Sequence, residues 1–249
     1  MKKSSIFMAA VLALVLALGG TALAQKPVIN GIDANYPPFA YVDANGKPAG
    51  FDVESMDWIA KKMGFTVEHK PMDWDGIVPA LLAKKIDMVC SGMSITDERK
   101  QKVNFSNPYW NVAQVFVAKK GSTLTDNDIL KGQKKLGVQR GTSEADELQK
   151  LKETKGYNYD LRFYDSAPLA IEDLLNGRID AAAMDSLPAE DAMAKGKTVQ
   201  VVAKFGEPEN FGVAIRKEDA DLLKKVNDGY KMLMADPHWQ QLKDKYLKK

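Results

Sequence analysis

Short β-prone runs alternate with helical patterns along the chain from residue 28 onward. The first strand is predicted at 28–32 and the next at 65–70. Between them, 41–51 is predicted to form a hairpin around the turn dipeptide Asn45-Gly46. Residues 52–63 carry apolar side chains at helical spacing and precede Gly64, a residue type that often ends a helix. Strands that alternate with helices predict βαβ units and largely parallel sheets, so the fold class is α/β.

One helix–turn–strand pattern occurs twice. Residues 81–91 and 174–184 align without a gap, and each reads as a helix end, a tight turn and a buried strand. In open α/β sheets, the residues just past the carboxyl end of a strand line the ligand crevice. Ser91-Gly92 and Asp185-Ser186 stand at these two places, so the pattern predicts two such edges, one in each of two lobes.

Two α/β units in one chain predict a small-molecule site in the crevice between them. The connections expected between the lobes, near 111–117 and 201–210, are short and contain no long flexible linker. Short extended crossings would form a hinge that bends without letting the lobes drift apart. We therefore expect hinge closure around a ligand.

The first residues follow a different pattern. Lys2 and Lys3 precede an apolar stretch of 13 residues at 6–18, and 22–24 is the small-residue sequence Ala-Leu-Ala. A helix that crosses a bilayer needs about 20 apolar residues. The segment is therefore interpreted as a signal peptide, residues 1–24, cleaved after Ala24, which predicts a periplasmic protein.

Composition narrows the functional classes. The chain of 249 residues is 45% hydrophobic and 27% charged, which excludes disorder, collagen and coiled coil. Loss of Lys2 and Lys3 leaves 33 basic and 33 acidic residues, whereas nucleic-acid binding requires a basic excess on one face. With one cysteine, Cys90, and two histidines, no disulfide or zinc spacing exists, and neither histidine accompanies a nucleophile elbow. We expect no metal, no cofactor and no hydrolase.

Seven short motifs follow one another along the chain. They are GIDANYPPF at 31–39, GFDV at 50–53, MDWDGIVPAL at 72–81, SGMSITDER at 91–99, GVQRGTS at 137–143, IDAAAMD at 179–185 and FGVAIRK at 211–217. Together they closely resemble the periplasmic polar-amino-acid-binding proteins of ABC importers, the solute-binding family 3 with lysine/arginine/ornithine-, histidine- and glutamine-binding types.

The resemblance implies a two-lobed periplasmic binding protein fold of type II, each lobe a mostly parallel sheet flanked by helices. It implies lobe 1 at 25–112 and 207–249, and lobe 2 at 113–206. Proteins of this family are not enzymes. They close on one free L-amino acid and deliver it to an ABC transporter permease in the inner membrane. We expect a monomer with these two partners.

A free amino acid carries a carboxylate and an ammonium on one carbon, so its receptor needs a cation and an anion. The resemblance places Arg99 at the carboxylate position and Asp185 at the ammonium position, and a guanidinium can bind a carboxylate through two parallel hydrogen bonds. From the residues alone, Arg99 would more readily form a surface salt bridge. Asp185 could instead cap the helix that Pro188 begins, although Ser186 could cap it equally well.

Further contacts with the carboxylate are expected from both lobes. Gly141, Thr142 and Ser143 precede a helix predicted at 144–152, and the backbone N–H groups and helix dipole there favour an anion. As an isolated motif they are only a helix cap. Ser91, Gly92 and Ser94 would add bonds from the first lobe, and Gly92 allows close backbone approach.

The family's side-chain specificity positions correspond to Asp33, Tyr36, Trp74, Gln139 and Glu144. Carboxylates there favour a cation or an amide over an anion, and aromatic rings stack well on a guanidinium. Tyr36 and Trp74 could also be core aromatics, and Glu144 a solvent-facing helix residue. The prediction is arginine or lysine, with glutamine second. Arg140 would weaken this preference if it entered the crevice.

Two alternatives remain at this level. The same fold occurs in periplasmic cyclohexadienyl or arogenate dehydratases, in which Asp33 or Glu144 could act as the general acid. Such prephenate-type substrates lack the amino group that Asp185 would meet. The chain could also be a ligand-sensing protein that docks on a receptor.

Overall fold

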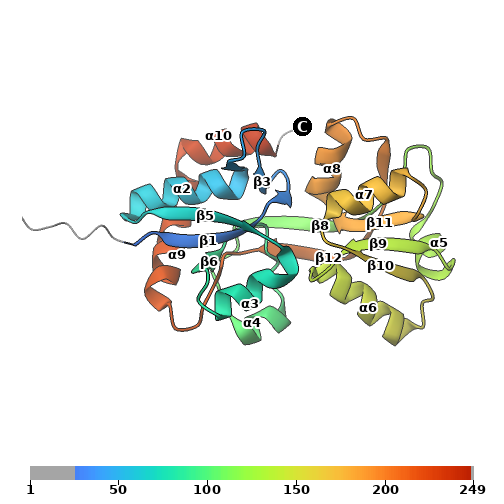
Figure 1. Ribbon diagram of the computed structural model, residues 1–249, viewed down its shortest axis with the longest axis horizontal. Helices are drawn as coiled ribbons and strands as arrows, with labels where there is room; N and C mark the ends of the chain where they lie inside the picture. Colours follow the sequence, from blue (N-terminus) through green and yellow to red (C-terminus); the bar gives the residue numbers. More distant parts are fainter. Residues whose placement is uncertain (1–25, 248–249) are drawn as a thin grey trace, which may run out of the picture.

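The computed structural model describes residues 26–247, so the predicted signal peptide lies outside the described residues. Two five-stranded sheets lie side by side, each covered by helices (Figure 1). A small sheet of three strands lies beside the first and contains β2 (Asn35–Tyr36), β3 (Ala40–Val42) and β4 (Pro48–Ala49). As predicted, the turn at Asn45-Gly46 lies between two antiparallel strands, β3 and β4.

The first sheet has the order β5-β1-β6-β13-β7. These strands are β1 (Val28–Asp33), β5 (Val67–Met72), β6 (Met88–Val89), β7 (Asn104–Phe105) and β13 (Ala214–Ile215). One face packs against α2 (Phe51–Met63), α9 (Ala220–Ala235) and α10 (Pro237–Tyr246), through residues such as Ile59, Tyr230 and Leu242. The other face packs against α3 (Ile77–Leu82), near η2 (Trp74–Gly76) and α4 (Asp97–Lys102).

The second sheet has the order β10-β9-β11-β8-β12. Its strands are β8 (Trp110–Lys119), β9 (Lys135–Gln139), β10 (Asp160–Tyr164), β11 (Ala181–Asp185) and β12 (Val199–Phe211). Side chains alternate between its faces: Val115 and Val117 pack under α7 (Ala167–Leu175) and α8 (Ser186–Ala194). Phe116 packs in the cluster under α5 (Asp126–Lys131) and α6 (Ser143–Lys155). Burial of both faces explains why the central strand β11 and the part of β8 at 115–118 are almost continuously apolar.

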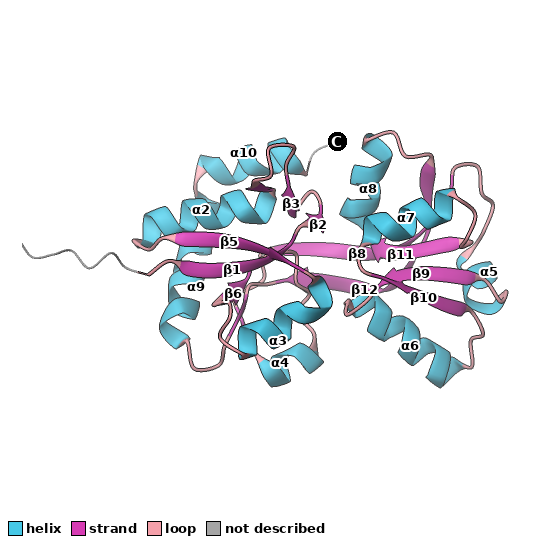
Figure 2. Cartoon of the chain, in the orientation of Figure 1, coloured by secondary structure: helices cyan, strands magenta, loops and turns pink. Residues whose placement is uncertain are grey.

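Both sheets mix parallel and antiparallel pairs. β1 runs parallel to β5 and β6, and β9 runs parallel to β10 and β11. In the first sheet β13 runs antiparallel to β6 and β7, and in the second sheet β8 runs antiparallel to β11 and β12. The strands β8 and β12 run along the middle of the molecule (Figure 2). The predicted lobe boundaries, at 112/113 and 206/207, fall inside these two strands and stay predictions.

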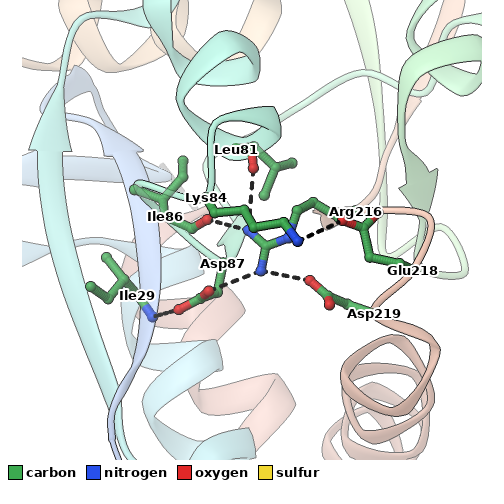
Figure 3. Close-up of polar contacts among 8 residues, drawn as sticks. All are labelled: Ile29, Leu81, Lys84, Ile86, Asp87, Arg216, Glu218 and Asp219. Carbon is green, nitrogen blue, oxygen red and sulfur yellow. Dashed lines mark hydrogen bonds and ion pairs between the residues drawn. The ribbon is translucent and has the colours of Figure 1, made fainter.

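A buried arginine ties the C-terminal part of the first sheet to the segment before β6. Arg216 is only 7% exposed, and its guanidinium donates to the carbonyl oxygens of Leu81 and Ile86 (Figure 3). The same group pairs with Asp87 at 2.9 Å and with Asp219 at 2.6 Å. Asp87 also accepts a bond from the Ile29 backbone N–H. Because a charge this deeply buried needs partners, we assign this network a structural role.

Other local expectations can be checked directly. The single cysteine, Cys90, is buried at 0% exposure, as expected for a residue in the buried strand predicted within 81–91. The strand predicted at the end of 81–91 covers only Met88–Val89, because the Cys90 N–H donates to the Asn30 side chain instead of a neighbouring strand. Among residues 26–247, no helix combines the length and apolar character that a membrane crossing requires.

Candidate functional site

One cavity between the two sheets contains every residue expected to contact a ligand. About 420 Å³ between its lining residues is not filled by atoms, a volume that includes space open to solvent. The expected residues that line it are Asp33, Tyr36, Trp74, Ser91, Gly92, Ser94, Arg99, Gln139, Thr142, Ser143, Glu144 and Asp185, and three apolar residues, Ala167, Ala183 and Met184, complete it. The structure therefore brings together residues that are far apart in sequence; their binding of a ligand stays a proposal.

The lining residues lie where strands end and helices begin. Asp33 ends β1 and Ser91 lies two positions after the end of β6, whereas Gln139 ends β9 and Asp185 ends β11. Thr142 is the N-cap of α6 and accepts a bond from the Ala145 N–H. Both sheets thus present their carboxyl edges to one cavity, the arrangement in which α/β proteins bind small molecules.

Direct hydrogen bonds join the two sides of the cavity. The Tyr36 hydroxyl donates to the Asp185 carboxylate, and Gln139 Nε2 donates to Asp33 Oδ2 at 2.7 Å. Trp74 Nε1 and Arg99 Nη2 donate to the Gly141 carbonyl oxygen at 3.0 and 3.1 Å. The two sides are in contact, so the structure shows a closed arrangement.

Asp185 presents a carboxylate oxygen that lacks a partner. It occupies the N-cap position of α8, yet its side chain makes no capping bond. Its Oδ1 atom is buried without a hydrogen-bond partner, and the residue is 6% exposed. Burial, and then the negative charge of Glu144, hold the pKa of Asp185 well above its usual range. A bound cation would satisfy this oxygen and lower that pKa.

Arg99 is a half-buried cation that forms no ion pair with any described carboxylate. Its guanidinium donates to the carbonyl oxygens of Ser94 and Gly141, and its central carbon lies 5.6 Å from the centroid of the Trp74 ring. Burial lowers the pKa of Arg99, while the charge of Glu144 opposes this shift. The surface salt bridge that sequence alone favoured is therefore not formed, and the charge remains available to an anion.

Asp33 and Glu144 add two more buried carboxylates, 3% and 4% exposed. Burial raises the pKa of both, and hydrogen bonds from Gln139 and Asn35 partly offset the rise at Asp33. Glu144 is therefore not the solvent-facing residue that was considered as an alternative. Like Asp185, neither residue forms an ion pair within residues 26–247.

Arg140 lies outside the cavity. Its Nη1 atom pairs with Asp165 Oδ1 at 2.8 Å, and both side chains are at least half exposed. The residue next to it, Gln139, points inward because β9 alternates its side chains between faces. Arg140 therefore does not neutralise the acidic cavity.

Glu209 is a neighbour of the site that sequence reasoning missed. Its Oε2 atom accepts a bond from Ser143 Oγ at 2.6 Å, and its charge contributes to the raised pKa values of Glu144 and Asp185. It lies on the long strand β12, two positions before the last residue of the strand, Phe211. No local pattern distinguishes it from Glu207, an acidic residue two positions earlier.

A buried carboxyl group next to the cavity binds the backbone of one of its lining residues. Asp52 is 0% exposed, and its Oδ2 atom accepts bonds from the Gly92 N–H at 2.6 Å and the Tyr109 hydroxyl at 2.7 Å. Gly92 has a φ of +60°, and a Cβ there would lie 2.3 Å from Cε1 of Tyr36. Only glycine fits this contact. Asp52 therefore fixes a backbone that lines the cavity.

The buried position of Asp52 predicts a pH dependence of folding stability. Burial raises its pKa to about 7, although the bonds from Tyr109 and Gly92 oppose the rise. Since the unfolded group titrates near 4, the folded state holds the proton between about pH 4 and pH 7. Stability should therefore fall as pH rises through this window, by up to about 1.4 kcal/mol per pH unit from this group.

Asp52→Asn is expected to flatten this decline, as measured by urea unfolding at several pH values. Glu68→Gln, which changes an exposed carboxylate on β5, is the control that should keep the wild-type slope. An unchanged slope in Asp52→Asn would contradict the assignment.

Comparison with known proteins gives consistent results. Residues 28–249 match the sequence profile of the bacterial extracellular solute-binding proteins, family 3. An L-arginine-binding protein of Pseudomonas aeruginosa is 39% identical, over 91% of this chain and 90% of that protein. An L-cystine-binding protein of Escherichia coli is 38% identical, over 87% of this chain and 80% of that protein. The structure of an ancestral arginine-binding protein bound to arginine superposes with a TM-score of 0.83 at 36% identity, covering 90% of this chain and all of the other.

Proposed function

The chain belongs to family 3 of the bacterial extracellular solute-binding proteins, and from this premise we propose that it binds one free, basic L-amino acid. Arginine or lysine is favoured and glutamine is second. We further propose that the protein works as a periplasmic monomer, after cleavage of residues 1–24, and delivers the ligand to an ABC permease in the inner membrane.

The fold is that of the type II periplasmic binding proteins. The similar proteins are binding proteins. This chain is likewise a binding protein and not an enzyme. The dehydratase alternative is thereby set aside.

The proposal divides the ligand's backbone between two charged residues. Arg99 would bind the α-carboxylate through its guanidinium fork, assisted by N–H groups at the start of α6 near Ser143. Asp185 would accept the α-ammonium through Oδ1, the oxygen that has no partner. Tyr36, which already donates to the other oxygen, would orient the carboxylate.

The observation that carries the preference for a basic ligand is the charge imbalance of the cavity. Asp33, Glu144 and Asp185 line it together with one cation, Arg99. Buried charges without partners cost several kcal/mol each unless they are protonated or compensated. A basic amino acid supplies two cationic groups and one carboxylate, so it compensates this set better than a neutral or acidic amino acid.

Contacts for the ligand side chain would come from the remaining lining residues. Asp33 and Glu144 would receive the guanidinium or ammonium group, and Gln139 would exchange its bond to Asp33 for one to the ligand. The Trp74 ring, on which Arg99 already stacks, offers an aromatic surface for the aliphatic or guanidinium part.

Closure follows from the same contacts. We propose that 25–112 with 207–249 and 113–206 act as lobes that rotate about β8 and β12. Arg99 lies in one and Asp185 in the other, so a ligand that bridges them favours the closed form. The permease can sense the ligand only through this difference in affinity between the open and closed forms.

A thermal-shift screen of refolded, ligand-stripped protein tests the proposal. A ligand that binds only the folded state raises the melting temperature, so arginine or lysine should raise it selectively among the twenty L-amino acids. A rise with glutamine alone would contradict the basic preference. A response to prephenate or arogenate, with none to any amino acid, would contradict amino-acid binding.

Ligand binding should also release protons. Burial raises the pKa values of Asp33, Glu144 and Asp185, so part of this group is protonated without ligand, and the cationic groups of the ligand lower those values. Arginine affinity should therefore fall as pH is lowered. Titration calorimetry in buffers of different ionisation enthalpy measures the released protons directly, and buffer-independent heats would contradict this linkage.

A further inference from the structure

A second cleft lies beside the cavity and is lined by residues of α4 and α6. These two helices lie on the same side of β8 and β12 (Figure 1). About 1140 Å³ between the lining residues of the cleft is not filled by atoms, a volume that includes space open to solvent. The residues that line it are Ile95, Thr96, Asp97, Glu98, Gln114, Ser143, Asp146, Glu147, Lys150, Gly206, Glu207, Pro208 and Glu209. The cleft is therefore bounded by both proposed lobes and by the two strands β8 and β12.

The lining of this cleft is strongly acidic. Six carboxylates line it, two each from α4, α6 and β12, and Lys150 is the one cationic residue among the lining residues. The two α4 carboxylates, Asp97 and Glu98, pair with Lys100 and Lys102 of their own helix. The remaining four carboxylates form no ion pair within residues 26–247.

A buried amide provides an independent indication that the cleft accepts a hydrogen-bond donor. Gln114 lies on β8 and is 2% exposed, yet its Oε1 atom has no hydrogen-bond partner. This oxygen lies 3.0 Å from the position of a Cβ at Gly206, which also lines the cleft. Buried amide oxygens are normally hydrogen-bonded. Carboxylates and an amide oxygen without a donor together suit the N–H groups of an ammonium or guanidinium ion.

The cleft is connected to the cavity through one pair of residues. Ser143 lines both spaces. Its hydroxyl donates to Glu209, a cleft residue on β12. A cation that contacts Glu209 in the cleft would therefore be separated by Ser143 from the site proposed for the amino acid.

We propose that this acidic cleft is a capture site for the cationic side-chain group of a basic amino acid, which it binds weakly before the ligand enters the cavity. The choice of ligand class rests on the proposed function. Clefts lined by one sign of charge raise the local concentration of an opposite charge and its association rate. The site thus acts on the rate of association, and the cavity determines the rate of dissociation.

The test compares two triple variants that change net charge equally. The cleft variant carries Asp146→Asn, Glu147→Gln and Glu207→Gln, none of which lines the cavity. The control carries Glu68→Gln, Glu190→Gln and Asp221→Asn, all exposed and outside both spaces. Stopped-flow measurement of tryptophan fluorescence, with Trp74 in the cavity, gives the arginine association and dissociation rates.

We expect the cleft variant to lower the association rate about threefold to tenfold at low ionic strength. Its dissociation rate and the rates of the control should stay at wild-type values. Added salt should reduce the difference. Equal association rates in wild type and cleft variant, or equal losses in both triple variants, would overturn the proposal.

A second measurement separates the cleft from the cavity. In an Asp185→Asn protein, whose cavity is disabled, millimolar L-arginine should still shift the nuclear magnetic resonance signals of the Gln114 side chain and the Gly206 amide. The three cleft substitutions should abolish these shifts. Absence of the shifts, with tight arginine binding in the wild-type protein, would overturn the capture site alone. Absence of tight arginine binding in the wild-type protein would overturn the proposed function, and with it the choice of ligand for the cleft.

Discussion

Asp185→Asn should weaken amino-acid binding about 10³-fold, because it removes the anion proposed for the α-ammonium group. The substitution keeps the shape of the side chain and still offers an oxygen to the Tyr36 hydroxyl. The carboxylate, whose Oδ1 atom has no partner, becomes an uncharged amide. The ligand ammonium would then be buried without a counter-charge, which costs several kcal/mol.

The same substitution should not destabilise the ligand-free protein. Burial and the charge of Glu144 already disfavour the ionised form of Asp185 and raise its pKa. Removing a disfavoured charge therefore leaves the melting temperature equal or higher. Calorimetric titration and thermal unfolding of the same sample measure both effects, with Glu190→Gln on the exposed side of α8 as control. Loss of folding in Asp185→Asn would mean that the residue is structural.

Arg99→Ala should likewise weaken binding about 10³-fold, because no other cation lines the cavity within residues 26–247. The ligand carboxylate would keep only backbone and hydroxyl donors. Arg99 forms no ion pair with any described carboxylate, so its loss removes two bonds to carbonyl oxygens and the contact with Trp74. The melting temperature of the ligand-free protein should therefore change little.

Arg99→Lys distinguishes a fork from a point charge. Lysine keeps the charge but cannot make two parallel bonds to a carboxylate, so binding should recover only in part. Arg140→Ala is the matched control, since it removes a neighbouring arginine that pairs with Asp165 outside the cavity. Wild-type affinity in Arg99→Ala, or an equal loss in Arg140→Ala, would contradict the role assigned to Arg99.

Residues at strand ends could be predicted well from the sequence. Asp33, Ser91, Gln139 and Asp185 stand at or just after the carboxyl ends of buried strands, and the alternation of strands and helices indicates where such ends fall. All of them line the cavity. Their positions depend on local patterns and on the topology of parallel strands, both of which are encoded in short segments.

Three features depended on tertiary contacts that short segments do not encode. The strand at β6 ends early because Asn30 captures the Cys90 N–H. Arg140 turns to Asp165, a partner 25 positions away, and so leaves the cavity. Glu209 reaches Ser143 across 66 positions from inside a strand. In each case a long-range polar contact decided the outcome, and no local periodicity indicates it.

The preference for a basic ligand depends most on the charge of the residues that line the cavity. Three acidic residues, Asp33, Glu144 and Asp185, line the cavity together with one cation, Arg99. Glu209 accepts a hydrogen bond from Ser143, which also lines the cavity. A ligand with two cationic groups and one carboxylate would compensate this arrangement, whereas an acidic amino acid would add to the imbalance. The preference for a basic ligand therefore follows from the buried charges themselves and adds to what the similar proteins suggest.

The most direct test of this central claim is a calorimetric titration of ligand-stripped wild-type protein with L-arginine, beside L-lysine, L-glutamine and L-glutamate. We expect saturable binding of one equivalent, tightest for arginine or lysine, weaker for glutamine and undetectable for glutamate. Tight binding of glutamate, or of glutamine with no response to arginine or lysine, would contradict this claim.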